Sequence, residues 1–237
     1  MPIPTVRQLL HDALDAVLPQ RCVVCGRFGA ALHLDCRASL PRAQPPRCER
    51  CWSPGDRLLC DSCVTSAPAY AGLRAGYCFT GPVRRAILEA KFRGMTTLLP
   101  PLAAEAALSV PSAWAVDLVV PIPLHPNRQR QRGYNQAAIA AREVARVLGV
   151  PYGEPLRRVR ATPAQAGLDA LQRQRNIRGA FAAISGPGAP VVASFAGSVV
   201  LLVDDVSTTG ATFAEVARAL LDAGVARVYA LSMARED

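Results

Sequence analysis

The stretch VVLLVDDVSTTGAT, residues 199–212, decides the fold class of this chain. Its aliphatic residues predict a buried strand that ends at the adjacent carboxylates Asp204 and Asp205, and the small hydroxyl residues after them predict a turn that opens a helix. Backbone N–H groups of such a turn, together with the positive end of the helix, can close around a phosphate. The carboxylates then lie where the hydroxyls of a ribose would be, and they could bind Mg²⁺. The stretch therefore predicts a site for a phosphate and a ribose.

Two other phosphate-binding motifs are absent from the chain. It contains neither the G-x-G-x-x-G fingerprint of dinucleotide-binding folds nor the G-x-x-x-x-G-K-[ST] sequence of P-loops. The stretch instead resembles the phosphoribosyl-pyrophosphate (PRPP) signature of the type I phosphoribosyltransferases. This resemblance implies that Asp204 and Asp205 bind the ribose hydroxyls and that the 5′-phosphate is held by the turn, Ser207, Thr208, Thr209, Gly210, Ala211 and Thr212. The alternative is an ordinary α/β strand that ends in two solvated acids.

Length and composition indicate a two-part, cytoplasmic protein. A chain of 237 residues can form one core domain of about 150–170 residues with a small satellite. The apolar fraction of 51% suffices for a core, and no run approaches about 18 apolar residues, so we expect no membrane insertion. Residues 1–20 predict an amphipathic helix rather than a signal peptide, because His11, Asp12 and Asp15 interrupt the apolar run.

Seven of the eight cysteines lie between residues 22 and 63. They include three C-x-x-C pairs, and a histidine completes a fourth pair in the sequence HLDC at 33–36. Without a secretory signal, this pattern favours metal binding over disulfides, because each pair can direct two ligands at one metal ion. Sequential pairing predicts one Cys₃His site and one Cys₄ site, formed by Cys22, Cys25, His33 and Cys36 and by Cys48, Cys51, Cys60 and Cys63.

Zinc is the metal that suits these two sites best. Tetrahedral coordination by cysteine and histidine is typical of structural zinc, although iron–sulfur ligation is possible in principle. A segment this short and polar has too little apolar area to fold without a metal. We expect one or two zinc ions, because the Cys₃His site could be degenerate, with His33 merely exposed. Cys78 stands apart from both sites and is expected to be an ordinary buried thiol.

The chain from residue 70 onward alternates between strand-like and helix-like segments. Helices are predicted at 82–92, 98–108, 134–149 and 210–223, and strands, besides the one within 199–212, at 72–79, 116–121, 156–160, 179–184 and 225–234. Strands separated by helices predict an α/β fold with a mostly parallel sheet flanked by helices. Ligands of such sheets bind beyond the carboxyl ends of the strands, where residues 121–124 and 204–210 both lie.

Positive charge is concentrated in the middle of the chain. The formal net charge is +9, and residues 117–180 alone hold 11 arginines against 4 acidic residues, a net charge of +7. Two arginine clusters stand out, at 128–132 and 173–178. These arginines could bind the pyrophosphate of PRPP, bind the backbone of a nucleic acid, or form a solvated basic face. Lys91 is the only lysine of the chain, which by itself indicates nothing.

Four motifs in a fixed order make a more specific resemblance. They are the cysteine pairs, PIPLHPNRQRQRGYNQA at 121–137, QAGLDALQRQRNIRGAF at 165–181, and the stretch 199–212. This set resembles the ComF family of competence-associated, phosphoribosyltransferase-like proteins over nearly the whole chain, with His33 standing where a cysteine is expected. The resemblance implies a double zinc ribbon at 21–68 and a type I phosphoribosyltransferase domain at 70–237. It also implies a role in DNA uptake during natural transformation or in handling single-stranded DNA, with DNA-uptake or helicase proteins as partners.

The same resemblance assigns roles to further residues. It implies a pyrophosphate loop formed by Pro121, Ile122 and Pro123. The segment 161–178 resembles a mobile loop that closes over the reaction centre, where Arg173 or Arg175 could reach the leaving pyrophosphate. The reaction would be displacement of pyrophosphate at the anomeric carbon, with little acid–base work for the protein. The catalytic candidates are Asp204, Asp205, Arg132 and Arg175.

Two functions from different classes are compatible with these motifs. One is the binding of PRPP and Mg²⁺ by a protein associated with DNA uptake or single-stranded DNA. The other is a phosphoribosyltransferase of nucleotide salvage or synthesis that acts on a nitrogen acceptor. Such an enzyme needs an aromatic or polar hood over its acceptor, and the sequence identifies none. The first function is therefore favoured, and the acceptor of the second is not named by the sequence.

Overall fold

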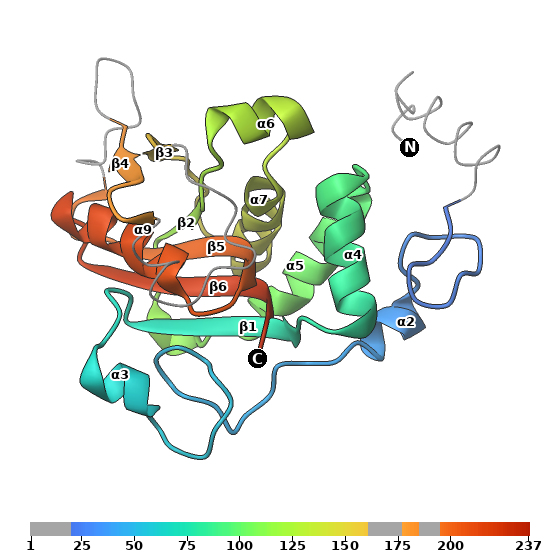
Figure 1. Cartoon of the computed structure of the whole chain (residues 1–237), viewed down its shortest axis with the longest axis horizontal. Coiled ribbons are helices and arrows are strands. Elements are labelled where there is room, and N and C mark those ends of the chain that lie inside the picture. The colour runs from blue at the N-terminus through green and yellow to red at the C-terminus, as the bar shows by residue number, and fades with distance from the viewer. Residues whose placement is uncertain (1–19, 161–176, 185–194) are drawn as a thin grey trace.

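The computed structural model describes residues 20–160, 177–184 and 195–237 (Figure 1). Its centre is a four-stranded parallel sheet in the order β1-β6-β5-β2. The strands are β1 (Gly72–Cys78), β2 (Leu118–Pro121), β5 (Val199–Ser207) and β6 (Arg227–Arg235). A separate antiparallel pair is formed by β3 (Leu156–Arg158) and β4 (Phe181–Ala183). The predicted α/β fold with a parallel sheet flanked by helices is confirmed.

Four of the longer helices lie close to their predicted positions. They are α4 (Gly81–Phe92), α5 (Leu99–Ala107), α7 (Gln136–Leu148) and α9 (Ala211–Asp222). No periodic pattern in the sequence predicts α6 (Pro126–Arg132), which begins where the side chain of His125 accepts a hydrogen bond from the backbone N–H of Asn127. The remaining helical segments are short: α2 (Leu34–Ala38), α3 (Asp61–Thr65), and two 3₁₀ turns at Thr96–Leu98 and Ser112–Trp114.

Some predictions cannot be compared with the structure. The amphipathic helix expected at 1–20 falls almost entirely on residues 1–19, and Arg173 and Arg175 belong to 161–176; these residues lie outside the described part of the chain. Among the helices of the described part, none combines the length and the apolar character needed to span a bilayer.

The sheet separates two apolar layers, because neighbouring side chains of a strand point to opposite faces. In β5, Leu201 and Val203 pack with α5 and α7 on one face. Val200 and Leu202 pack with Phe213 of α9 on the other face. All of these side chains are at most 1% exposed, so the strand is buried on both sides, as parallel sheets usually are.

The cysteine-rich segment 20–69 packs against this sheet. Its Val23 and Leu40 join the apolar layer that contains α5 and α7. Trp52 joins the opposite layer, and its indole N–H donates to the carbonyl of Ala43 at 3.1 Å. The segment therefore contributes side chains to both faces of the core of the α/β unit.

The prediction that the strand within 199–212 ends at its two carboxylates is wrong. β2 pairs with β5 only as far as Pro121, opposite Val203. β6 continues on the other side, and it pairs with β5 up to Ser207, opposite Arg235. Because β6 supplies hydrogen bonds beyond the end of β2, Asp204 and Asp205 lie inside the strand.

Candidate functional site

A hollow of about 190 Å³ lies at the carboxyl end of β5. Its walls come from three elements: the end of β5 with the turn into α9, Lys91 of α4, and Phe79 directly after β1. The structure brings together here most of the predicted ligand-binding residues, namely Asp204, Ser207, Thr208, Thr209, Gly210, Ala211 and Thr212. The N-terminus of α9 faces the same turn, which gives the hollow the positive end of a helix.

The turn depends on Gly210. This residue has a φ of +74°, which side chains rarely adopt, and a Cβ atom placed on it would overlap the hydroxyl oxygen of Tyr70. The hydroxyl of Thr209 accepts a hydrogen bond from the N–H of Ala211 at 3.3 Å. The hydroxyl of Ser207 instead bonds with that of Ser232 at 2.8 Å and is buried. Only the backbone of Ser207 is therefore available to a ligand, because its side chain already bonds with Ser232 inside the sheet.

The two carboxylates have different surroundings. The ammonium Nζ of Lys91 lies 2.9 Å from both carboxylate oxygens of Asp205, and that carboxylate does not line the hollow. Asp204 lines the hollow and accepts a hydrogen bond from the N–H of Asp205 at 2.8 Å. Burial and the nearby negative charge of Asp205 raise the pKa of Asp204 to about 7. Asp205 is therefore paired with Lys91, and of the two carboxylates only that of Asp204 lines the hollow; the assignment of both to ribose hydroxyls stays a prediction.

Two cations beside these carboxylates are missing from the sequence-based site. Lys91 is 114 residues away from Asp205 in the chain, so only the packing of α4 against the sheet brings the two together. Burial, followed by repulsion from Arg128, lowers the pKa of Arg158 in β3, and the attraction of Asp204 partly offsets this. The guanidinium of Arg158 also lies 5.3 Å from the ring centre of Phe181. The only feature of the sequence that could have pointed to Lys91 as part of the site is that it is the single lysine, and that feature is not specific.

The predicted pyrophosphate loop begins next to the carboxylates. The N–H of Ile122 donates to the carbonyl of Val203 at 2.9 Å, one residue before Asp204. The carbonyl of Ile122 accepts from the side-chain amide of Asn135 at 3.0 Å, and the oxygen of the same amide caps α7 through the N–H of Ala137. Pro121 is buried at the end of β2 and Pro123 is half-buried in the loop. Arg132, at the end of α6, does not line the hollow.

The first cysteine cluster has the geometry of a metal site. The ligand atoms of Cys22, Cys25, His33 and Cys36 all lie within 4.8 Å of one another. Cys25 Sγ is 3.4 Å from Nδ1 of His33, close to the about 3.6 Å expected for two ligands of one tetrahedral zinc ion. Nε2 of His33 donates to the carbonyl of Phe28 at 3.2 Å, which leaves Nδ1 as the ligand atom. Hydrogen bonding to Arg27 lowers the pKa of Cys25 to about 6, which favours the thiolate.

The second cluster is more deeply buried. The sulfurs of Cys48, Cys51, Cys60 and Cys63 lie within 4.8 Å of one another, and the distance between those of Cys51 and Cys60 is 3.6 Å. Sulfurs that share a tetrahedral zinc ion are about 3.8 Å apart. Burial raises the pKa of Cys48, but hydrogen bonds from nearby backbone N–H groups outweigh it and bring the value to about 6. Both clusters could thus hold a metal ion, and their geometry fits structural zinc.

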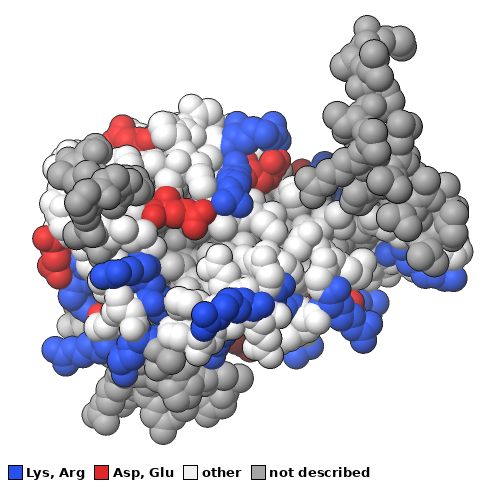
Figure 2. All heavy atoms as spheres, turned by 90° about the horizontal axis from the view of Figure 1, so that it is seen from above, with Lys and Arg blue, Asp and Glu red and all other residues white. Residues whose placement is uncertain are grey.

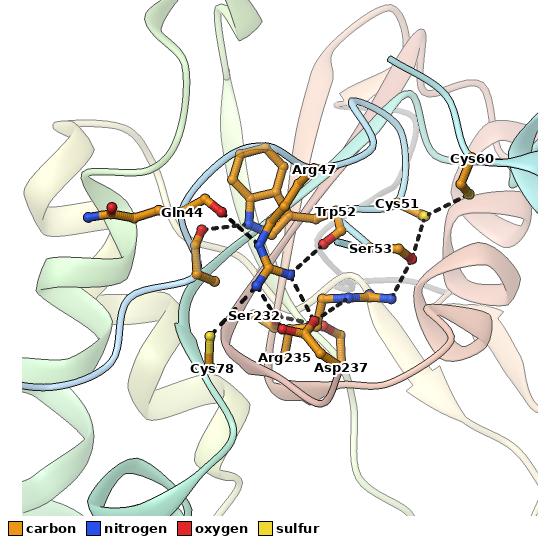
Figure 3. Close-up of polar contacts among 12 residues, drawn as sticks. Gln44, Arg47, Cys51, Trp52, Ser53, Cys60, Cys78, Ser232, Arg235 and Asp237 are labelled. Atoms are coloured by element: carbon orange, nitrogen blue, oxygen red, sulfur yellow. Dashed lines mark hydrogen bonds and ion pairs between the residues drawn. The ribbon is translucent and has the colours of Figure 1, made fainter. Parts of the chain in front are cut away.

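A polar network connects the second cluster to the end of β6 (Figure 3). The hydroxyl of Ser53 lies 3.0 Å from Sγ of Cys51 and accepts a hydrogen bond from Nη2 of Arg235 at 2.8 Å. Both oxygens of the Asp237 side chain accept hydrogen bonds from Arg47, at 2.8 and 2.7 Å. Nη2 of Arg47 also lies 3.6 Å from Sγ of Cys78, which is half-buried and so less enclosed than predicted. The second cysteine cluster and the sheet are therefore directly connected through Ser53 and Arg235.

Comparisons with known proteins agree with this architecture. The chain is 29% identical over 227 residues to Competence protein F of Haemophilus influenzae, covering 91% of this chain and 96% of the relative. It is 30% identical over 233 residues to the DNA utilization protein YhgH of Salmonella typhi, covering 92% and 98%. The chain belongs to the ComF family. A model of the phosphoribosyl transferase domain matches residues 135–235 of this ComF family protein, which include Asp204, Asp205 and the turn.

Solved structures also resemble part of the chain. One is the glutamine PRPP amidotransferase of B. subtilis complexed with ADP and GMP, with a TM-score of 0.35 and 22% identity over 55% of this chain. A structure described as the allosteric regulatory enzyme of purine biosynthesis gives the same values. The ComF family protein spans 25% and 24% of those two chains.

Proposed function

We propose that this protein binds PRPP together with Mg²⁺ at the turn between β5 and α9, and that it acts in DNA uptake during natural transformation. The observation that carries the proposal is the hollow itself. It combines a small-residue turn, the N-terminus of α9, the carboxylate of Asp204 and the ammonium of Lys91. This combination offers donors to a phosphate and an acceptor to sugar hydroxyls at one place.

Each side chain of the hollow has a distinct task in this proposal. The backbone N–H groups of the turn and of the first turn of α9 bind the 5′-phosphate. Asp204 accepts from the ribose hydroxyls, and Asp205 orients Lys91 so that its ammonium faces the ligand. When bound, Mg²⁺ neutralises the pyrophosphate of PRPP. The loop of Pro121, Ile122 and Pro123, which begins next to Val203, supplies the pyrophosphate side of the site.

The role in DNA uptake rests on the relatives and on charge. The similar proteins carry the names Competence protein F and DNA utilization protein. The net charge of +7 over residues 117–180, from 11 arginines and 4 acids, is compatible with a nucleic-acid partner. We further propose that both cysteine clusters hold structural zinc, two ions per chain, because the four ligand atoms of each cluster lie within 4.8 Å of one another, close enough to share one ion.

Isothermal titration of the purified protein with PRPP and Mg²⁺ tests the ligand. We expect saturable binding that is lost in Asp204→Ala and in Thr209→Tyr, since the tyrosine fills the turn. Thr97→Tyr is the matched control, because Thr97 is also an exposed threonine but lies outside the hollow. Equal affinity in the wild type and both site variants, with unchanged circular dichroism, would refute the assignment.

Release of pyrophosphate distinguishes binding from turnover. The same protein is incubated with PRPP, Mg²⁺ and a panel of nitrogen bases, and pyrophosphate is measured over time. Binding without release, whatever the base, is the expected result for a PRPP-binding module. Rapid release with one base, abolished in Asp204→Ala, would identify a phosphoribosyltransferase instead.

A further inference from the structure

An exposed aromatic ring stands near the hollow and has no part in the function proposed above. Phe92 is the last residue of α4, directly after Lys91, and 71% of its surface is exposed. The guanidinium of Arg132, at the end of α6, lies 5.4 Å from the centre of this ring. Exposed phenylalanine is unfavourable in water, whereas a ring beside a guanidinium is a good surface for a planar group.

The position of this pair is fixed by the backbone. The hydroxyl of Tyr134, two residues after Arg132, donates a hydrogen bond to the carbonyl of Ala90 near the end of α4. Gly133, which lies between Arg132 and Tyr134 in the chain, ends α6 in the left-handed conformation with a φ of +81°. The ends of α4 and α6 are therefore tied together, and Phe92 and Arg132 are held side by side rather than meeting by chance.

Positive charge continues from this pair along α6. The helix carries Arg128, Arg130 and Arg132 and contains no acidic residue. Arg130 is braced by a hydrogen bond to the side chain of Asn127 at 2.6 Å. The cations thus extend along α6 as far as Phe92.

The wider surface supports a local site rather than a general one. Figure 2 looks down on the side that carries α6; its Lys and Arg side chains form separate groups, and Asp and Glu side chains lie beside some of them. On α4, Glu89 forms an ion pair with Arg93 at 3.5 Å, so its charge is balanced. A partner that binds here needs negative charge to pair with the arginines of α6 and a planar group to stack on the ring of Phe92.

We propose that single-stranded DNA binds along α6 with one base stacked on Phe92. The phosphates contact Arg128, Arg130 and Arg132, and the ring of Phe92 with the guanidinium of Arg132 forms the stacking surface. Bases of a duplex are already stacked on each other, so duplex DNA can use the arginines but not the ring. This inference rests on the proposed role in DNA uptake and assigns that role to a surface distinct from the phosphate turn.

Binding of fluorescent oligo(dT) by Phe92→Leu tests the ring. Leucine keeps the apolar character and removes the aromatic face. We expect about tenfold weaker binding with an unchanged salt dependence, because no charge is altered. Leu108→Ala is the control, since Leu108 is also 71% exposed and lies outside this surface. Wild-type affinity in Phe92→Leu would overturn the proposal.

Two further variants check the mode of binding. Phe92→Trp should retain affinity, and its fluorescence should be quenched by oligo(dT) but not by duplex DNA. Replacing Arg128, Arg130 and Arg132 by Ala should lower the salt slope by up to about three units. Duplex DNA that competes as well as oligo(dT) would refute the stacking arrangement.

The remaining comparison is with the other exposed phenylalanine–arginine pair. Phe28 lies 3.9 Å under the guanidinium of Arg21 beside the first cysteine cluster. If Phe28→Leu weakens oligo(dT) binding and Phe92→Leu does not, the DNA surface is elsewhere and the proposal is wrong. PRPP titration of Phe92→Leu should match the wild type, so failure of this inference and failure of PRPP binding at the turn are separate results.

Discussion

The cysteine-rich segment 20–69 and the sheet that follows it are stabilised in different ways. In the sheet, Val200, Leu201, Leu202 and Val203 are fully buried in succession, and helices cover both faces. Segment 20–69 contains two helices of five residues each and isolated bridges, and several of its buried side chains are cysteines. Burial of apolar side chains can stabilise the sheet, whereas the segment has too little apolar core and needs additional stabilisation, such as metal ligation.

The two regions nevertheless share an interface. Trp52 belongs to the same apolar cluster as Leu73 of β1, and Arg74 lies between Trp52 and Trp114, 4.2 Å from the first ring and 5.2 Å from the second. The network of Figure 3 adds polar contacts between Ser53 and Arg235. A change at one of these interface contacts should therefore affect both regions, whereas a change inside the cysteine clusters should act mainly on segment 20–69.

Removal of metal has the largest expected effect. A strong chelator should make 20–69 sensitive to protease while the sheet resists, because ligation of structural zinc is worth about 10 kcal/mol or more in small domains. Limited proteolysis followed by mass spectrometry locates the cleavage sites. Cys78→Ser serves as a control, since Cys78 belongs to neither cluster and should change neither metal content nor cleavage. Simultaneous loss of the sheet would mean that the two regions are not separable.

Substitution of Gly210 comes next. Gly210→Ala should cost about 3 kcal/mol of unfolding free energy, because a left-handed residue gains a side chain that meets the hydroxyl of Tyr70. The ring carbon behind that hydroxyl is 3.3 Å from the place that the new Cβ would take, so Tyr70→Phe should restore part of the loss. Urea unfolding of both single variants and the double variant measures the coupling. Additive effects would contradict the contact between the turn and Tyr70.

Asp204 should make stability depend on pH in an unusual direction. Burial raises its pKa to about 7 from 3.8, so the folded state keeps a proton that the unfolded state loses as pH rises through this window. The stability contributed by the protonated form is present below pH 4 and lost by pH 7. At pH 8 the wild type must hold an ionised carboxylate at this buried position, whereas Asp204→Asn holds a neutral amide. The variant should therefore be about 2 kcal/mol more stable than the wild type at pH 8.

The same variant should also fail to bind PRPP and Mg²⁺, since it has no charge to offer. Thermal unfolding of the wild type and Asp204→Asn at pH 4 and pH 8 gives the comparison, and Asp56→Asn, at an exposed acid, controls for the loss of one charge. A difference in stability that is the same at both pH values would contradict a raised pKa. In that case, ionisation of Asp204 would not lower the stability of the folded state.

The smallest expected effect is that of Ser53→Ala. It removes the hydroxyl between Arg235 and Sγ of Cys51, and we expect about 1 kcal/mol of lost stability. Because groups behind the ligands tune metal affinity, zinc should also transfer to a chelator about tenfold faster. Ser66→Ala, at an exposed serine outside the network, should behave as the wild type. Unchanged zinc transfer in Ser53→Ala would show that the network connects the two regions without affecting metal binding at the cluster.

Much of the candidate site could be predicted because it is local in sequence. The turn from Ser207 to Ala211 forms a continuous segment, and its small residues indicate a phosphate turn without knowledge of the rest of the chain. The cysteine pairs are equally local, because the spacing within each C-x-x-C and the order of the pairs specify which ligands can meet. The positions of α4, α5, α7 and α9 follow from apolar periodicity, which is also a short-range property.

The remaining features were decided by the order of the strands, β1-β6-β5-β2, which no local pattern contains. Asp204 and Asp205 lie inside β5 because β6, from later in the chain, extends the hydrogen bonding to Ser207. Lys91 faces Asp205 across 114 residues, and Arg235 reaches Ser53 across 182. Sequence alone thus determined the approximate positions of the strands, the turn and the two groups of candidate metal ligands, because each depends on neighbours along the chain. Tertiary structure decided which carboxylate lines the hollow and which cations accompany it, because those depend on side chains from distant elements meeting at one edge of the sheet.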